Sequence, residues 1–378
     1  MIAARAGEAW RQSVRSSRPM AAEGATGRRG WFRAGAWAAF LVIVLVFAAC
    51  ARDRRQQSRP TGHENATAEP VATFSIVAYD PDTGDLGVAV QSRFFGVGSV
   101  VPWARAGVGA VATQALANTT YGPRGLGLLA AGASPEQVVA ELTAADSERE
   151  QRQLAVVDAS GRAATFTGSA CIAWAGGRTG AHYAAQGNLL ADPAVIDAMV
   201  TAYELAEGDL ATRLVAALAA GQAGGGDARG RQSAALLVVR KEGGYLGFND
   251  RYVDLRVEDH PAPIRELRRL LDLRHANIAA RQARHHLGSG EPALALEAAQ
   301  QATTLSPDEG SVWMLLAAAR LALGDQEGAA AAGREALVRD PWLKKALLGG
   351  LLQAETLNQL LTIESFARFW ETIPAPSH

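Results

Sequence analysis

The sequence predicts an α+β fold in which two β-sheets pack together between outer helices, followed by a short all-α array. Between residues 73 and 273, strand-like and helix-like segments come in separate runs, and such segregation is typical of packed sheets with helices outside. From residue 274 onward, small residues recur with a period of 34, which is typical of stacked helix pairs. We therefore expect an α+β domain over residues 73–273 and a helical array over residues 274–378.

The composition indicates a globular chain of about two domains and argues against several classes of function. The 378 residues are 48% apolar and 20% charged, so a large core can form. A net charge of -1 gives no reason to expect nucleic acid as a partner. Two cysteines, Cys50 and Cys171, cannot build a disulfide framework or a thiolate metal site, and no HExxH pair occurs. We expect neither a metal nor another cofactor.

Residues 1–50 predict an export signal or membrane anchor. Arginines up to Arg33 precede the apolar run 34–50, which is shorter than the roughly 20 residues of a usual membrane-spanning helix. Ala48-Ala49-Cys50 resembles a bacterial lipoprotein cleavage box, in which Cys50 becomes the lipidated first residue; the alternative is an uncleaved signal anchor. Both place the rest of the chain outside the cytoplasm and tethered to the membrane. The polar residues 51–72 predict a flexible tether.

The segment 73–91 predicts a β-hairpin, because two apolar runs flank the turn Asp80-Pro81-Asp82-Thr83-Gly84-Asp85. Its first residue is Thr73, and the preceding signal and tether could be removed by proteolytic cleavage. A threonine freed at a chain start carries its own base, since its α-amino group can take the hydroxyl proton. The alternative is an ordinary strand residue, because threonine is β-branched and common in strands. Ser75 falls on the same strand face as Thr73.

The remaining elements of the first domain follow from glycine, proline and capping signals. We expect strands at residues 96–102, 107–112, 154–157, 163–166, 234–240, 245–248 and 253–257. We expect helices at residues 122–132, 134–145, 193–203, 210–220 and 263–274. Ser134 and Gln137 form the pattern of a capping box, and Gly221 follows the helix that ends at residue 220.

The period of 34 in the last part of the chain rests on four pairs of positions. Gly290, Ala295, Ala302 and Pro307 recur as Gly324, Ala329, Ala336 and Pro341. This pattern resembles tetratricopeptide repeats, in which small residues let paired helices approach closely. A terminal helix is expected over residues 343–369. The array is either a helical cap on the first domain or a groove for a peptide or protein partner.

Four separated blocks of the first domain resemble a known family. They are residues 73–115, FTGSACIAWAG at 166–176, QGNLL at 186–190 and AGGGDARGRQSAALLVV at 223–239. In this order they resemble the family named domain of unknown function 1028, over about residues 73–270. That family is grouped with the N-terminal-nucleophile (Ntn) hydrolases. The resemblance implies a four-layer αββα sandwich and hydrolysis of an amide bond.

The resemblance also implies catalytic roles for particular residues. Thr73, freed by cleavage after Ala72, would be the nucleophile, and a backbone N–H near Thr113 would stabilise the oxyanion. Ser92 and Arg105 lie near the places where the wider Ntn superfamily has residues that tune the amine. The usual Asp and Lys are absent here.

Polar clusters at predicted strand ends give candidate substrate-binding residues. The glycine-rich segment 224–233 could aim Asp227 and Arg229 into a cleft, where Arg229 would bind a carboxylate; the alternative is a solvated turn. The cluster at 186–188 has the same two interpretations. The predicted substrate-binding residues are Gln114, Asn118, Gln186, Asn188, Asp227, Arg229 and Gln232.

Two functions are compatible with this sequence. The first is hydrolysis of a small amide or peptide-like substrate at the cell envelope, with Thr73 as nucleophile. The second is a non-catalytic envelope module that uses the same cleft and the helical repeats to bind protein or peptide partners. The state of the mature N-terminus separates them, because only a chain that begins at Thr73 has an amine base there.

Overall fold

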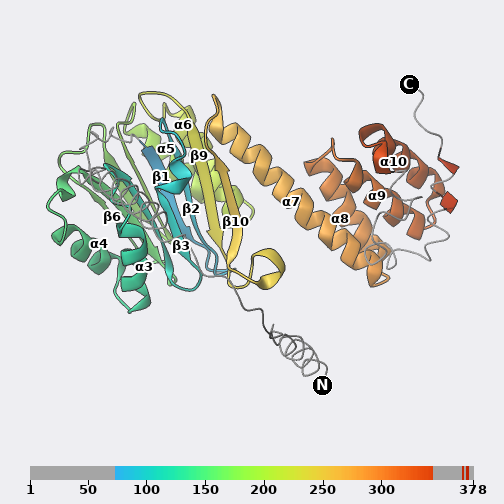
Figure 1. The fold of residues 1–378 in the computed structure, drawn as a ribbon, viewed down its shortest axis with the longest axis horizontal. Coiled ribbons are helices and arrows are strands. Elements are labelled where there is room, and N and C mark those ends of the chain that lie inside the picture. The colour runs from blue at the N-terminus through green and yellow to red at the C-terminus, as the bar shows by residue number, and fades with distance from the viewer. Residues whose placement is uncertain (1–72, 344–367, 370–371, 374–378) are drawn as a thin grey trace, which may run out of the picture. The chain divides into compact units, whose positions relative to one another are not determined.

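The computed structural model describes residues 73–343, 368–369 and 372–373, which form a mixed α+β domain and a helical array (Figure 1). The predictions for residues 1–72, including the export signal, the lipidated Cys50 and the tether, lie outside these residues. Most of the predicted terminal helix over 343–369 also lies outside them. Within the described ranges, no helix combines the length and the apolar character needed to cross a membrane.

The first sheet has six antiparallel strands in the order β10-β9-β2-β1-β8-β7. The strands are β1 (Thr73–Tyr79), β2 (Leu86–Ser92), β7 (Gly176–Gly180), β8 (Tyr183–Asn188), β9 (Ser233–Val239) and β10 (Arg251–Val257). The predicted hairpin of β1 and β2 is confirmed, with Thr73 opposite Ser92. Its turn is held by Asp80, whose carboxylate accepts hydrogen bonds from the Asp82 N–H and the Thr83 hydroxyl. β1 therefore lies inside the sheet, between β2 and β8.

The second sheet has four antiparallel strands in the order β3-β4-β5-β6. They are β3 (Pro102–Arg105), β4 (Gly109–Ala115), β5 (Arg152–Asp158) and β6 (Ala163–Thr167). β4 and β5 pair along their whole lengths, from Gly109 opposite Asp158 to Ala115 opposite Arg152. This pairing places Gly109 and Asp158 at one end of the sheet and Ala115 and Arg152 at the other.

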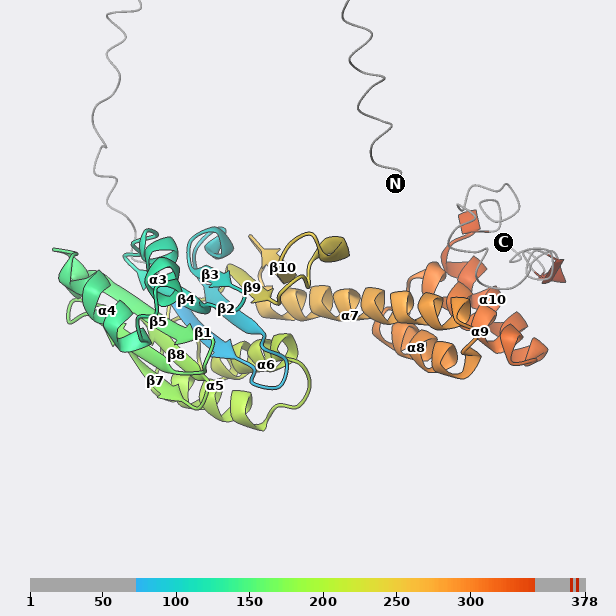
Figure 2. The same ribbon diagram turned by 90° about the horizontal axis from the view of Figure 1, so that it is seen from below.

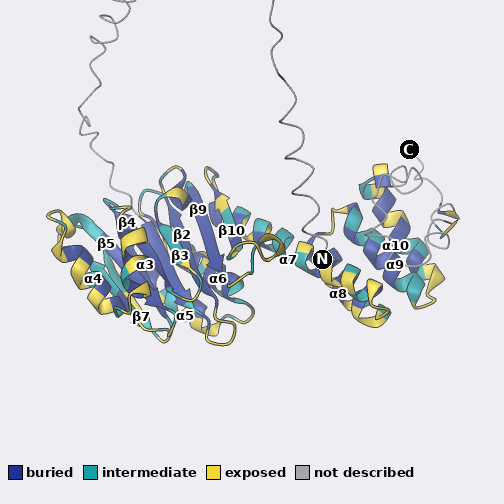
Figure 3. Ribbon diagram, turned by 60° about the horizontal axis from the view of Figure 1, so that its bottom comes forward, coloured by how far each residue is buried: buried dark blue, intermediate teal, exposed yellow. Residues whose placement is uncertain are grey.

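Helices cover the outer face of each sheet, so the domain has two helical layers around two sheets (Figure 2). The helices α5 (Ala194–Leu205) and α6 (Leu210–Ala223) pack on the six-stranded sheet, where Phe74 and Ile76 meet Leu214. The helices α3 (Tyr121–Ala130) and α4 (Pro135–Ala144) pack on the four-stranded sheet around Val111. Between the sheets, Val77 joins a third core with side chains of β4 and β5. The inner strands of both sheets are accordingly buried along almost their whole lengths, whereas the edge strands β3, β6, β7 and β10 are only partly buried (Figure 3).

The predicted capping box begins α4 as expected. The Ser134 hydroxyl accepts a hydrogen bond from the Gln137 N–H at 3.3 Å, and the Ser134 N–H donates to the Gln137 side chain at 2.8 Å. Asp209 caps α6 in a related way, accepting from the Thr212 N–H at 2.9 Å. Both caps bind N–H groups that a helix leaves without partners in its first turn.

Three expectations about single elements are wrong. Residues 97–99 form a 3-10 turn rather than a strand. Residues 245–247 also form a 3-10 turn, because Leu246 (φ 52°) and Gly247 (φ 78°) adopt left-handed conformations that break an extended strand. Gly221 lies inside α6 instead of ending it; a Cβ there would come within 2.6 Å of Met199 Cγ, so the close packing of α6 on α5 requires glycine.

One helix crosses the predicted boundary between residues 273 and 274. The helix α7 (Pro263–Gly288) packs Leu267 and Leu271 into the core on the six-stranded sheet. Its second half packs Ala279 and Ala283 into the core of the helical array. The array continues with α8 (Pro292–Leu305), α9 (Gly310–Ala322) and α10 (Gln326–Arg339).

The repeated positions of the array have matching structural roles in its two halves. Ala295 and Ala302 of α8, and Ala329 and Ala336 of α10, are all fully buried. The glycine before each of these helices has a positive φ, at 74° for Gly290 and 82° for Gly324. These glycines end α7 and α9 in a left-handed conformation that other residues adopt less readily.

A matched pair of glycines in α3 tests the packing of this helix on the second sheet. A Cβ on Gly122 would lie 2.2 Å from the Trp103 ring, whereas a Cβ on Gly127 meets nothing within 4 Å. We expect Gly122→Ala to lower the free energy of unfolding by about 1–3 kcal/mol through overpacking. Gly127→Ala should raise it by up to about 1 kcal/mol through helix propensity. Urea unfolding followed by circular dichroism measures both, and an equal effect of the two changes would contradict the packing.

The contact between α6 and α7 predicts a pH dependence of stability. His275 of α7 donates a hydrogen bond to Asp209 at 2.9 Å. Burial by itself would raise the pKa of Asp209, but the hydrogen bonds from His275 and Thr212 outweigh it and lower the pKa to about 2.

Because the folded pKa of Asp209 lies below its unfolded value, its stabilisation is complete above about pH 4 and is lost as the pH falls toward 2. Asp209→Asn keeps the cap and removes the charge. We expect this variant to be less stable than the wild type by about 2 kcal/mol at pH 7, with the difference vanishing near pH 2. A stability difference that does not change with pH would contradict the ionic contribution.

Candidate functional site

Polar residues form a row across one end of the six-stranded sheet. Thr73, the first residue of β1, lies opposite Ser92 of β2 and opposite Asn188 of β8. Ser92 in turn lies opposite Ser233 of β9. The Thr73 hydroxyl donates a hydrogen bond to the Ser92 hydroxyl oxygen at 3.1 Å. The sheet therefore aligns three hydroxyl groups and one amide at the end where β1 begins.

The strand alternation turns this row toward the second sheet. Phe74 and Ile76 face α5 and α6, whereas Val77 lies in the core between the sheets. Because side chains alternate along a strand, Thr73 and Ser75 face the same way as Val77. The space between the sheets is thus apolar around Val77 and polar around Thr73.

Two glutamine side chains from the second sheet fill the polar end. Gln114 Nε2 donates to the Thr73 carbonyl at 3.1 Å and to Gln153 Oε1 at 2.8 Å, while Gln114 Oε1 accepts from the Ser75 hydroxyl at 2.6 Å. Gln153 Nε2 donates to the Gly187 carbonyl at 2.8 Å. These bonds connect β4 and β5 to the beginning of β1 and the end of β8.

The amides of β8 extend the same network. Asn188 Nδ2 donates to Gln153 Oε1 at 2.9 Å. Gln186 Nε2 donates to the Ala112 carbonyl at 3.1 Å, and Gln186 Oε1 accepts from the Thr165 hydroxyl at 3.2 Å. Gln186 and Asn188 are buried, so these bonds replace those that water would otherwise provide. The network contains hydroxyls, amides and backbone carbonyls.

The glycine-rich loop meets this row beside Ser92. The Asp227 carboxylate is buried and accepts from the N–H groups of Arg93 at 2.8 Å and Arg229 at 2.9 Å. The Arg229 guanidinium forms an ion pair with the same carboxylate at 3.2 Å. The Gln232 N–H donates to the Ser92 carbonyl at 3.1 Å. Asp227 therefore fixes the loop next to the residue that receives the Thr73 hydrogen bond.

Thr113 and Asn118 belong to a different cluster, on the helical side of the second sheet. The Thr113 hydroxyl donates to the Asn118 carbonyl at 3.2 Å, and the Thr113 N–H already donates to the Val101 carbonyl. The Asn118 amide donates to Asp146 at 3.1 Å. The structure does not bring either side chain to Thr73, because Thr113 shares the outward strand face of Val111.

Asp146 explains why this second cluster is ordered. Its carboxylate accepts from Tyr121 at 2.8 Å and from Arg152 at 3.0 Å as well as from Asn118. Burial by itself would raise the pKa of Asp146, but these hydrogen bonds outweigh it and hold the pKa well below its usual range. The cluster ties β5 and α3 together and has the character of a structural anchor.

Arg105 lies at the other end of the second sheet. It pairs with Gly109, and Gln114 follows five residues further along β4, about 17 Å away at the rise of a strand. The Arg105 side chain is exposed. The geometry gives Arg105 no contact with the Thr73 row.

Sequence analysis missed several members of the network, the most connected of which is Gln153. The missed residues of the network are Gln153, Thr165 and Thr167. Ser233 was missed as well; it belongs to the row opposite Ser92, and its hydroxyl donates to the Phe94 carbonyl. A signal for Gln153 existed, because it precedes Ala155 and Val157 at alternate positions of a buried strand and is therefore a polar side chain in an apolar series. Within the residues that the structure describes, no group of three or more His, Cys, Asp or Glu side chains could hold a metal ion.

Comparison with known proteins confirms the family resemblance. Residues 73–267 match the model described as Family of unknown function (DUF1028), and the chain belongs to this family. The chain is also similar to a crystal structure of a protein from Silicibacter pomeroyi that carries the same family model. The two sequences are 37% identical, the match covers 53% of this chain and 88% of that chain, and the TM-score is 0.48. No curated protein matches the chain.

The contacts of Gln153 predict that it holds the two sheets together at their polar end. Replacing it with methionine keeps the volume but leaves the amide donors of Gln114 and Asn188 without their shared acceptor. We expect Gln153→Met to lower the free energy of unfolding by about 3 kcal/mol, because each unpaired buried group costs about 1–3 kcal/mol. Gln300→Met, at an exposed position of α8, should change it by less than about 0.5 kcal/mol. Equal stabilities of the two variants in urea unfolding would show that the network contributes little.

Proposed function

We propose that this chain is an Ntn-type hydrolase that cleaves amide or peptide-like bonds, with Thr73 as its nucleophile after cleavage between Ala72 and Thr73. The observation that carries the proposal is the place of Thr73, at the head of an internal strand, facing the polar end of the space between the sheets. The order of layers, with helices outside two packed sheets, supports an αββα sandwich of the Ntn-hydrolase class. The match to a family of unknown function leaves the activity to be tested.

In the proposed reaction the Thr73 hydroxyl oxygen attacks the substrate carbonyl carbon while the new α-amino group takes the hydroxyl proton. The tetrahedral intermediate then collapses, and the same ammonium group returns the proton to the leaving amine. Water hydrolyses the resulting ester and restores the hydroxyl. The neutral, buried surroundings suit this role, because burial lowers the pKa of an amine and favours the unprotonated base near pH 7.

The neighbours of Thr73 have distinct parts in this proposal. Ser92 accepts the Thr73 hydrogen bond and orients the nucleophile. Asn188 uses one N–H to bind Gln153, and its amide offers a second N–H that could stabilise the oxyanion. In this proposal Asn188 replaces the Thr113 N–H as the oxyanion donor, because the Thr113 N–H donates to the Val101 carbonyl. Gln114 donates a hydrogen bond to the Thr73 carbonyl and thereby fixes the orientation of the Thr73 backbone.

Substrate selection is assigned to the loop beside Ser92. Asp227 holds the Arg229 guanidinium at 3.2 Å, and the Arg229 side chain remains 29% exposed. In this position Arg229 is suited to bind a carboxylate of the substrate, with Gln232 beside it. Gln186 is engaged by Ala112 and Thr165, so its contribution is to shape the site rather than to bind the substrate directly.

The location and the helical array complete the proposal. We place the enzyme outside the cytoplasm, tethered through a lipid on Cys50 or through the apolar run 34–50. We assign α7–α10 to short tetratricopeptide-like repeats, on the strength of the matching alanines and glycines. The array would serve either as a cap on the α+β domain or as a groove for a protein partner.

One observation favours a non-catalytic binding module as the second candidate. Thr73 is fully buried in the uncut chain, and both amide groups of Gln114 and Gln153 are engaged in hydrogen bonds. Hydrolysis therefore requires that the chain before Thr73 is removed. A mature chain that remains continuous through residue 73 would favour the binding module.

The mature N-terminus and two variants of Thr73 test the proposed function. We expect the intact mass of the wild type to match a chain that starts at Thr73, and Thr73→Ala to remain uncut and without amidase activity. Thr73→Ser should be processed and retain partial activity, because it keeps a hydroxyl nucleophile. Thr201→Ala, at an exposed position of α5, is the control and should behave as the wild type. Amide hydrolysis that survives Thr73→Ala, or a wild-type chain that starts at Cys50, would refute the assignment.

A further inference from the structure

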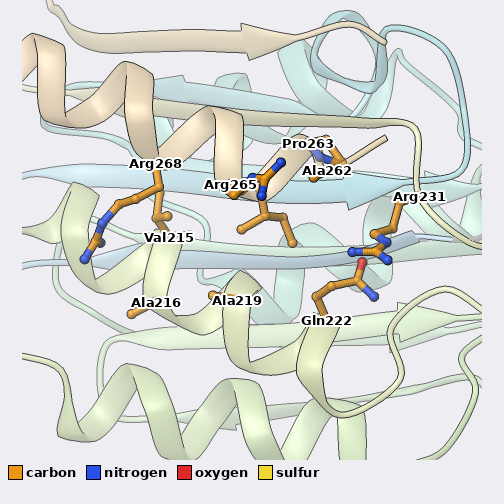
Figure 4. A pocket seen from close by; sticks show the side chains of 10 residues that line it. Val215, Ala216, Ala219, Gln222, Arg231, Ala262, Pro263, Arg265 and Arg268 are labelled. Carbon is orange, nitrogen blue, oxygen red and sulfur yellow. The ribbon is translucent and has the colours of Figure 1, made fainter. Parts of the chain in front are cut away.

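A groove of about 560 Å³ lies between α6 and the beginning of α7, on the helical side of the six-stranded sheet (Figure 4). Thr73 faces the opposite side of that sheet. The groove is therefore a separate feature of the domain. Its volume is within the range of about 300–1,000 Å³ that small-molecule sites occupy.

The wall and floor of the groove are apolar. Val215, Ala216 and Ala219 come from α6, and Pro263 and Ile264 come from the first turn of α7. The small side chains of α6 leave room along the helix, and aromatic rings are absent from the described lining. An aliphatic chain fits such a surface better than a nucleobase, which proteins usually stack on aromatic side chains.

The rim of the groove carries three arginines, Arg231, Arg265 and Arg268. The nearest carboxylates of α7 pair with arginines other than Arg231 and Arg265, since Glu266 pairs with Arg269 at 2.6 Å and Asp272 pairs with Arg268 at 3.8 Å. Among the ion pairs of the described residues, none involves Arg231 or Arg265. The rim is therefore positively charged and complementary to an anion.

Gln222 adds a second feature that points to a ligand. Its side-chain oxygen is buried and has no hydrogen-bond partner in the described structure, although the residue lines the groove. Figure 4 shows Gln222 and Arg231 at the same end of the groove, with Arg268 at the other end. An acceptor and a cation at one end fit a ligand that carries an N–H donor close to a carboxylate.

We infer that this groove binds an aliphatic carboxylate with an amide N–H beside the acid group, the chemistry of an N-acyl amino acid. The carboxylate lies at Arg231, the N–H donates to Gln222 Oε1, and the acyl chain follows Ala219, Val215 and Ile264. The aliphatic stem of Arg268 borders the far end of the chain, where long basic side chains cover apolar surface. The inference concerns a binding site and does not depend on hydrolysis at Thr73.

Calorimetric titration of the full chain with three matched probes tests this inference. The probes are N-decanoylglycine, its ester analogue decanoyloxyacetate, which lacks the N–H, and N-decanoylglycinamide, which lacks the charge. All three are used below their micelle concentrations, on the Thr73→Ala variant, so that no probe is turned over. We expect saturable binding of N-decanoylglycine, weaker binding of the ester by about fivefold, and weaker binding of the neutral amide by about tenfold or more.

Variants at exposed positions locate the site. Arg231→Gln should weaken binding of N-decanoylglycine by about tenfold, and Ala219→Phe, which fills the groove, should abolish it. Arg281→Gln, on the same helix as Arg265 but outside the groove, is the control and should leave the affinity unchanged. Circular dichroism checks that each variant is folded. No saturable binding, equal affinity for the three probes, or undiminished binding by Ala219→Phe would overturn the inference.

Discussion

The contacts of one amide, that of Gln153, set the separation and register of the two sheets at the end where β1 begins. Gln153 accepts hydrogen bonds from Gln114 and Asn188 and donates to the Gly187 carbonyl. A buried amide of this kind is stable only if its neighbours supply partners at the right positions, because an unpaired polar group away from water is costly. The polar side chains around Thr73 therefore form a connected set, in which each residue restricts the position of the next.

The same network distinguishes the two ends of the space between the sheets. At one end Val77 and its neighbours exclude water through close packing, as in any sandwich core. At the other end, Thr73, Ser75 and Ser92 replace apolar side chains on the same strand faces. Such a replacement brings no gain in stability, since an apolar core of similar shape is usually as stable or more so. Stability alone therefore does not account for these polar residues, and this is the physical reason for regarding that end of the domain as a candidate site.

Much of the fold could be predicted from the sequence, because several of the signals depend only on residues that are close in the chain. The hairpin turn around Asp80, the capping box at Ser134 and the buried alanines of the helical array each depend on residues close in the chain. The strand predicted at 245–248 is wrong at the turn 245–247. Its apolar residues are typical of a strand, but Leu246 and Gly247 adopt left-handed conformations. Apolar composition alone could not reveal that these side chains are exposed.

The candidate site was less predictable because it depends on pairing between distant strands. The row of Thr73, Ser92 and Asn188 contains residues that were expected to be functional. Their alignment, however, follows from a strand order that the sequence does not state. Arg105 and Thr113 illustrate the limits of such prediction. Arg105 is on the second sheet, which contributes Gln114 to the network, but it lies at the end of that sheet away from Gln114. Thr113 is one residue from Gln114 in β4, so its side chain is on the opposite face.

The uninterrupted course of α7 has a consequence for how this chain loses its structure. Leu267 and Leu271 belong to the core on the six-stranded sheet, and Ala279 and Ala283 belong to the core of the array, yet all four are in one helix. Because helix formation is cooperative along its length, melting of either core removes support from the turns that serve the other. The two parts should consequently denature together rather than as independent modules. A cut in the middle of α7 would leave two shorter helices, each without the continuous helix that supports its end.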